Sequence, residues 1–202
     1  MPVSSSPGTP RDRADHAPGT DTDRRFLLGA LAAGLLTCRV GTVRAQAESV
    51  ATEYQIKAAF LYKFIDYVEW PQASKPWPQA ALVIGVTGSN SLADELAAIV
   101  AQRSAPNRQI VVRRLQGAQN TEGLHVLFVG KGAGASAEDL LRTASARPIL
   151  TVTETEAAFA LGGVINFVVE ADKVRFDVAL QRAERSNIKI SSRLLSVARK
   201  VV

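Results

Sequence analysis

The sequence contains very little cysteine and histidine. Among its 202 residues Cys38 is the only cysteine, and His16 and His125 are the only histidines. Because Cys38 lies in a segment that we expect to be removed, the rest of the chain offers no disulfide and no thiolate for catalysis or metal binding. One histidine cannot build a histidine metal cluster or a Cys–His nucleophile. His125 sits in an apolar strand, which favours a hydrogen-bonded core residue. We therefore expect no metal, no cofactor and no catalytic residues.

The N-terminal part has no apolar run long enough to span a bilayer. Its run Phe26–Cys38 has thirteen residues, against the roughly 20 that a spanning helix needs. Arg24-Arg25 precede this run and Ala45-Gln46-Ala47 follow it, the layout of a secretory signal of the ordinary or the twin-arginine type. Residues 1–23 lack apolar periodicity and should be disordered. We expect residues 1–47 to be a disordered n-region with a cleavable signal, cut near Ala47, and residues 48–202 to form one domain.

Positive charge is concentrated at the C-terminal end. The chain carries a net charge of +5, and residues 173–202 hold eight Lys and Arg against Asp177 and Glu184. A basic tail can contact nucleic acid, anionic lipid or an acidic partner. Export argues against nucleic acid, and a solvated face is the simplest interpretation.

Half of the aromatic residues fall between Tyr54 and Trp70. Their spacing predicts one helix with Thr52 as N-cap and Pro71 as its end. The predicted apolar faces consist of Ile56, Phe60, Phe64 and Tyr67, and of Leu61, Ile65 and Val68, which leaves Lys57, Lys63, Asp66 and Glu69 on the polar remainder. This helix packs in the core, or its aromatic end also forms a site or an interface.

Alternating strands and helices follow this helix. Strands are expected at 81–86, 109–115, 124–129 and 149–152, with helices at 92–103, 136–146 and 154–161, and a hairpin pairs 164–170 with 173–179. Arg113-Arg114 mark the second strand as an edge strand. A further helix is expected from Arg193. The pattern predicts a three-layer α/β fold with a mainly parallel five-stranded sheet, flavodoxin- or Rossmann-like, in the order 2-1-3-4-5, and an antiparallel C-terminal hairpin.

Two glycine-bearing loops follow strands and lead into helices, where open α/β sheets bind ligands. The possible ligand residues in them are Gly88, Ser89, Gly130, Gly132, Gly134 and Ser136. The second loop lacks the spacing of a phosphate-binding P-loop. Flexible connectors are the simpler interpretation, and a small-ligand site is the alternative.

The C-terminal helix offers a candidate partner-binding surface with an apolar centre and a basic rim. Its residues are Ile190, Arg193, Leu194, Leu195, Ala198 and Val202. The same leucines could instead close the core of the domain, and the sequence leaves both possibilities open.

Three stretches together resemble the YfiR-like family of exported bacterial proteins. They are IKAAFLYKFIDYVEWP, RPILTVTETEAAFALGGVINFVVEADKVRFDVAL and AERSNIKISSRLLSVA. The residues that carry the likeness are Phe60, Phe64, Glu69, Trp70, Pro71, Gly162, Gly163, Asn166, Ser191 and Ser192.

The resemblance implies a periplasmic α/β domain without catalytic activity. It further implies an inhibitor that binds the periplasmic sensor domain of an inner-membrane diguanylate cyclase and so restrains cyclic-di-GMP signalling. Members of this family can form homodimers, so the resemblance also implies a possible homodimer. Many members carry cysteine pairs that residues 48–202 lack, so redox control is not expected here. The alternative is a periplasmic small-ligand binding module that uses the glycine-bearing loops.

Overall fold

The continuous apolar runs form the centre of one sheet. The computed structural model describes residues 50–76, 80–103, 108–116 and 121–202. Its main sheet has seven strands in the order β3-β2-β4-β5-β6-β7-β9, and a separate antiparallel pair joins β1 to β8. Neighbours in the main sheet are parallel except β6 and β7, which form the antiparallel hairpin. The predicted signal, residues 1–47, lies outside the described residues.

The elements have the following bounds. The strands are β1 Val68–Glu69, β2 Leu82–Thr87, β3 Ile110–Arg114, β4 Val126–Val129, β5 Leu150–Thr153, β6 Ile165–Glu170, β7 Lys173–Val178, β8 Lys189–Ile190 and β9 Lys200–Val201. The helices are residues 50–64, α2 Asn90–Gln102, α3 Ser136–Ser145, α4 Glu156–Gly162, α5 Leu180–Arg185 and α6 Ser192–Leu195, with short 3-10 turns η1 Ile65–Tyr67, η2 Gln72–Ser74 and η3 Lys131–Ala133.

The α/β class and the mostly parallel sheet are as predicted, but the sheet is larger than expected. Strands β3, β2, β4, β5 and β6 lie in the order expected for the first five strands. The count of five is wrong, because β7 and then β9 extend the same sheet beyond β6. The β9 pairing was not foreseen, since two residues carry no periodic signal.

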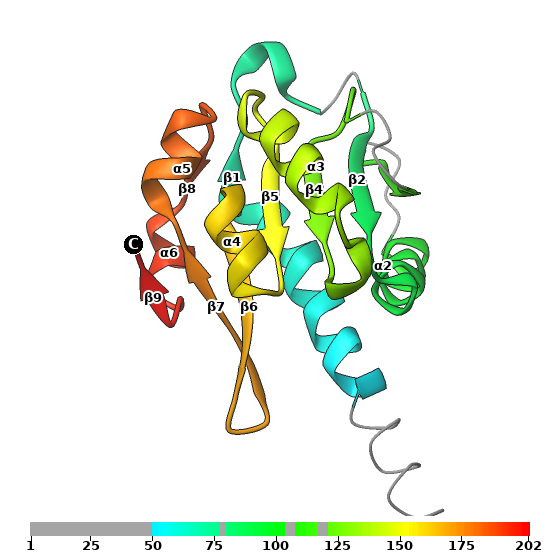
Figure 1. Ribbon diagram of the computed structural model, residues 1–202. Helices are drawn as coiled ribbons and strands as arrows, with labels where there is room; N and C mark the ends of the chain where they lie inside the picture. The colour runs from blue at the N-terminus through cyan, green and yellow to red at the C-terminus, as the bar shows by residue number, and fades with distance from the viewer. Residues whose placement is uncertain (1–49, 77–79, 104–107, 117–120) are drawn as a thin grey trace, which may run out of the picture. The chain divides into compact units, whose positions relative to one another are not determined.

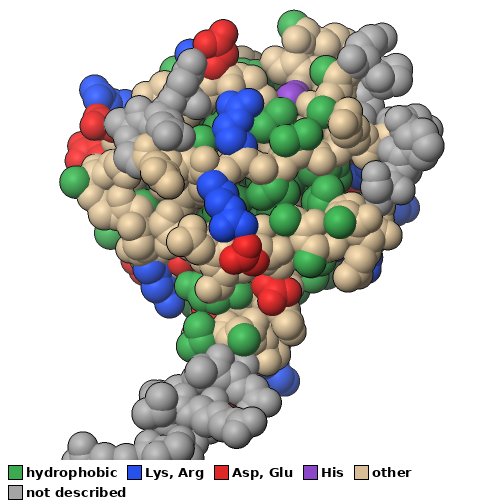
Figure 2. Space-filling view, turned by 90° about the vertical axis from the view of Figure 1, so that its right-hand side faces the viewer, with side chains coloured by type: hydrophobic (Ala, Val, Ile, Leu, Met, Phe, Trp, Pro, Cys, Tyr) green, Lys and Arg blue, Asp and Glu red, His purple; other side chains and the backbone are tan. Residues whose placement is uncertain are grey.

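Strand β3 is an edge strand, as its two arginines indicated. Arg113 donates to the Glu122 carbonyl and Arg114 pairs with Asp94 across to α2. Figure 2 shows the side of the molecule on which β2 and α2 lie in Figure 1. On this side, Lys and Arg side chains lie next to hydrophobic side chains at the surface. Charged side chains on an edge strand discourage pairing with another chain.

Two apolar cores lie on opposite faces of the sheet. Along β4, Val126 and Phe128 point into one core, whereas Leu127 and Val129 point into the other. The first core contains the helix over residues 50–64 and α2, and the second contains α3 and α4. Figure 1 shows α3 and α4 in front of the sheet and the 50–64 helix behind it. The three-layer arrangement follows from this alternation.

The aromatic helix differs from its prediction at both ends. It is already helical at residue 50, so Thr52 is not its N-cap, and its α-helical part ends at Phe64. The chain then passes through η1 into β1, where Val68 pairs with Ile190 and Glu69 with Lys189. Backbone pairing with a distant strand therefore ends the helix before Pro71 can.

The C-terminal helix begins where it was predicted but is shorter than expected. The helix that begins after Ser191 is only four residues long, and Val201 lies in β9 with its side chain exposed. Arg199 donates through Nε and Nη2 to both carboxylate oxygens of Asp177, which holds this segment against β7. The polar stretch before this segment forms α5, a helix without a clear apolar period.

Candidate interaction surface and the buried charge network

The two glycine-bearing loops pack against each other through their backbones. The Gly132 N–H donates to the Gly88 carbonyl at 3.0 Å, and the Gly130 N–H donates to the Thr87 carbonyl at 2.8 Å. A Cβ on Gly88, whose φ is +71°, would lie 2.3 Å from the Ala133 nitrogen. These glycines are needed because only a bare backbone allows so close an approach. At this contact the loops fill the space between them.

The remaining loop residues make local contacts. The Ser89 hydroxyl accepts from the Leu92 N–H at 3.2 Å and caps α2. Ser136 does not cap α3; its hydroxyl donates to the Ala133 carbonyl at 2.6 Å. Gly134 takes a positive φ of 58°. Binding of a ligand by these loops stays a prediction, and their contacts are those of a connector.

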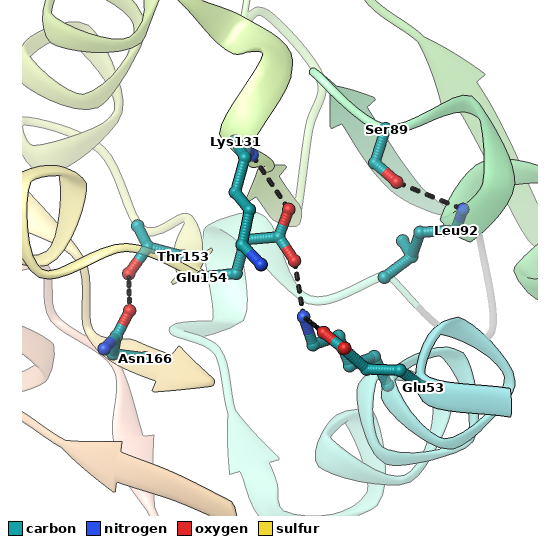
Figure 3. A network of polar contacts seen from close by, with 8 residues as sticks. Glu53, Ser89, Leu92, Lys131, Thr153, Glu154 and Asn166 are labelled. Atoms are coloured by element: carbon teal, nitrogen blue, oxygen red, sulfur yellow. Dashed lines mark hydrogen bonds and ion pairs between the residues drawn. The ribbon is translucent and has the colours of Figure 1, made fainter. Parts of the chain in front are cut away.

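A buried charge network lies beside these loops (Figure 3). Glu154 directly follows β5; its Oε2 is 2.5 Å from Lys57 Nζ, and its Oε1 accepts the Lys131 N–H at 2.8 Å. Glu53, one helical turn before Lys57, places Oε1 2.5 Å from the same Nζ. The side chains of Lys57 and Glu154 are 2% and 0% exposed. The network ties the 50–64 helix to the loops at the carboxyl ends of β4 and β5.

Lys57 carries its proton at neutral pH. Burial alone would lower the pKa of Lys57, but hydrogen bonds to Glu154 and Glu53 outweigh burial and raise the pKa above 10.5. A protonated amine is not a nucleophile, so this lysine serves structure. The prediction that Lys57 lies on the polar face of the helix was wrong. In the sequence, the one sign that Glu154 would be the partner of Lys57 is its position directly after a buried strand.

His125 is hydrogen-bonded, as predicted, but it is half-buried and directly precedes β4. Its Nδ1 accepts the Val83 N–H at 3.1 Å, and its carbonyl accepts Nε1–H of Trp70 at 3.3 Å. Burial lowers the pKa of His125 below 6.5. His125 therefore links β2 through its ring and the segment after β1 through its carbonyl. In the described residues no three His, Cys, Asp or Glu side chains gather as a metal site would require.

The residues of the family likeness at the end of the first helix build the first core. Phe60 and Phe64 pack with Phe167 and Phe176, with ring centroids 5.0 to 6.3 Å apart. Trp70 is buried against His125. Glu69, Trp70 and Pro71 also line a groove of about 470 Å³, whose other wall includes Ile188 and Lys189.

The later residues of the likeness fix strand and helix ends. Asn166 accepts the Thr153 hydroxyl at 2.8 Å in the core, and a Cβ on Gly163 would meet the same hydroxyl at 2.8 Å. Gly162 is the last residue of α4 and has a φ of 149°. Ser191 caps α6 and its N–H donates to the Tyr67 carbonyl. Ser192 is the first residue of α6.

The predicted partner-binding residues separate into core and surface. Leu194 is buried in the first core, which favours the core possibility for this residue. Ile190, Leu195 and Ala198 are half-buried against that core. Arg193 and Val202 are exposed. A role for these exposed and half-buried residues in partner binding remains a prediction.

A different apolar surface lies where the hairpin meets the C-terminal segment. A hollow of about 300 Å³ is lined by Phe60, Lys173, Val174, Arg175, Phe176 and Val197. Val197 is 60% exposed, and Val169, which faces Val174 across the hairpin, is 47% exposed. We call the apolar residues Ile56, Phe60, Val169, Val174 and Val197 the hairpin surface. Sequence reasoning missed it because its members come from three separate segments.

A sequence model of the YfiR/HmsC-like family matches residues 54–199, more than two thirds of the chain. The chain belongs to this family. YfiR/HmsC-like proteins are known as periplasmic regulators of cyclic-di-GMP signalling and form a non-enzymatic family. No curated protein matches the chain significantly. None of the helices in the described residues combines the length and apolar character of a membrane span.

Proposed function

We propose that this protein is an exported, non-enzymatic regulator that inhibits an inner-membrane diguanylate cyclase by binding that enzyme's periplasmic sensor domain. The observation that carries the proposal is the YfiR/HmsC-like family match over residues 54–199. In this proposal residues 1–47 direct export and are removed, and the domain acts in the periplasm. No cofactor, metal or nucleic acid takes part.

The arrangement of charged and apolar groups supports action by contact. Lys57 and Glu154 neutralise each other inside the fold, and Asp177 is buried against Arg199. The hairpin surface, in contrast, leaves large apolar side chains in solvent. Exposed apolar groups that surround a hollow are typical of a protein interaction site.

The test measures cyclic-di-GMP in the source bacterium. Deleting the gene should raise the cyclic-di-GMP level. Expressing residues 48–202 behind an unrelated export signal in the deletion strain should return cyclic-di-GMP to the wild-type level. Periplasmic domains of the membrane-bound GGDEF cyclases, purified one at a time, should include one that binds the protein in titration calorimetry. Unchanged cyclic-di-GMP in the deletion strain together with no binding domain would overturn the proposal.

A small-ligand module is the second candidate, on the strength of the groove beside Trp70. Its volume of about 470 Å³ lies within the range of small-molecule sites, and Trp70, Pro71 and Ile188 give it an apolar floor. The location differs from the predicted glycine-bearing loops. A ligand present at 100 times its Kd should add about 2.7 kcal/mol of stability in a thermal shift assay. A metabolite panel without any shift would argue against it.

A further inference from the structure

The residues of the hairpin surface come from distant segments, and three of them line one hollow. The hollow places Phe60 of the first helix beside Val174 of β7 and Val197 of the C-terminal segment. Val169 lies opposite Val174 in the hairpin register, and Ile56 lies one helical turn before Phe60. Phe60 itself is only half-buried, with its ring packed 5.7 Å from that of Phe176. One apolar hollow is therefore open to solvent at the hairpin.

The rim of the hollow is basic. Lys173 and Arg175 line it, and both side chains are exposed. Among the described residues neither one forms an ion pair, whereas Arg199 contacts both Asp177 and Glu170. Arg199 therefore offsets two of the acidic groups of the hairpin. Of the hairpin acids only Asp172, at the turn, is left without an ion pair in the described part of the chain.

We propose that the hairpin surface binds a segment of a partner protein that carries a large apolar side chain flanked by Asp or Glu. The apolar side chain enters the hollow between Phe60, Val174 and Val197. The flanking carboxylates pair with Lys173 and Arg175. This inference rests on the proposed function, because it names the surface and the chemistry through which the partner would be held.

Charge also distinguishes this occupant from two others. A second copy of the chain would bring one basic rim against another if the same surface met itself in a two-fold dimer, and like charges there repel. An anionic membrane would attract Lys173 and Arg175, but it would also meet Asp172 at the hairpin turn, which has no ion pair within the described residues. A concave hollow also fits one inserted side chain better than a flat bilayer surface.

The test uses two fluorescein-labelled peptides with the same alternating leucine and phenylalanine positions. One peptide has glutamate at every other position, and its control has lysine there. Fluorescence anisotropy with residues 48–202 should show the acidic peptide binding at least tenfold more tightly, with an affinity that falls as salt rises. Equal binding, or no binding of the acidic peptide, would overturn the proposal.

Matched variants locate the binding. Val197→Asp and Lys173→Glu should each weaken the acidic peptide at least tenfold. Leu161→Asp changes an equally apolar side chain that is 46% exposed on α4, away from the hollow, and should change the affinity less than twofold. Circular dichroism melts confirm that each variant is folded. Wild-type affinity in folded Val197→Asp would rule the surface out.

Further measurements address the other occupants and the proposed function separately. The proposal would be overturned if the protein bound vesicles of three parts phosphatidylcholine to one part phosphatidylglycerol and this binding depended on Lys173. It would also be overturned if light scattering showed a dimer that Val197→Asp dissociates. If the Val197→Asp variant lowers cyclic-di-GMP in the deletion strain as well as the wild type does, the regulatory function stands and this surface is wrong. If the acidic peptide binds as expected but gene deletion leaves cyclic-di-GMP unchanged, the surface stands and the regulatory function fails.

Discussion

Two regions of the molecule reverse the usual distribution of side chains. Beside the glycine-bearing loops, Lys57 and Glu154 are charged and buried, whereas at the hairpin surface Val169 and Val197 are apolar and exposed. The buried charges hold elements together and offer little to a ligand. The exposed valines contribute little to the core and remain available to a partner. Stability and function are therefore expected to respond to different substitutions.

Removing one member of the buried pair should have the largest effect. In Lys57→Met, Glu154 stays buried and, within the described part of the chain, keeps only the hydrogen bond from the Lys131 N–H, so stability should fall by about 3–5 kcal/mol. Urea unfolding measures the loss. Lys63→Met is the control, because Lys63 pairs with Asp66 at the surface, and it should change stability by about 0–1 kcal/mol. Equal losses in the two variants would contradict the role given to burial.

The double variant Lys57→Met, Glu154→Leu sharpens the same point. It removes both charges, so it should recover much of what the single variant loses. A double variant no more stable than Lys57→Met would show that the shape of the site matters more than its charge.

The loop contact predicts the next largest effect. Gly88→Ala combines a positive φ with a backbone clash, and should cost at least about 3 kcal/mol. Gly123→Ala is the matched control, because Gly123 has the same φ of +71° and nothing lies within 4 Å of an added Cβ. It should cost only about 1–2 kcal/mol in thermal unfolding. Similar losses would mean that the two loops can separate without harm.

His125 predicts a smaller, pH-dependent effect. Because burial lowers the pKa of His125 in the folded state, the folded protein favours the neutral ring. The contribution of His125 to stability is therefore fully present above pH 6.5 and is lost as the pH falls below that value. Protonated Nδ1 cannot accept the Val83 N–H, a bond worth about 0.5–1.5 kcal/mol. Denaturation at pH 7.5 and 5.5 should show this decline in the wild type. The decline should be reduced in His125→Asn, and an unchanged pH profile in that variant would exclude His125 as its source.

The smallest effect on stability is expected at the hairpin surface. Val197→Asp adds a charge at a residue that is 60% exposed, and should alter the unfolding free energy by less than about 0.5 kcal/mol. A loss as large as that of Lys57→Met would place Val197 in the core and remove the contrast between the regions.

Local patterns predicted much of the fold. Continuous apolar runs located β2, β4 and β5, and the two arginines marked β3 as an edge. The hairpin was also correct, and its turn residues Ala171 and Asp172 adopt φ of 47° and 58°. Strand β1 was missed, because its hydrogen-bonding partner lies far away in the chain.

The candidate site was less predictable than the fold. Leu194 and Val202 share one short segment, yet one is buried and the other exposed. Periodicity placed both on one helical face, but the helix ends after Leu195 and the chain turns to join β7. The partner-binding prediction therefore mixed core and surface residues. The hairpin surface could not be found from sequence because no single segment contains it.

By itself the sequence determined the alternation of strands and helices, the edge strand and the family, because each depends on the spacing of neighbouring residues. Only the tertiary structure decided that Lys57 is buried and that β9 joins the sheet. Lys57 and Glu154 are 97 residues apart, and a two-residue strand has no period of its own. Whether a charge is paired or a valine is buried depends on which distant segment packs against it. The spacing of neighbouring residues does not determine which segment that is.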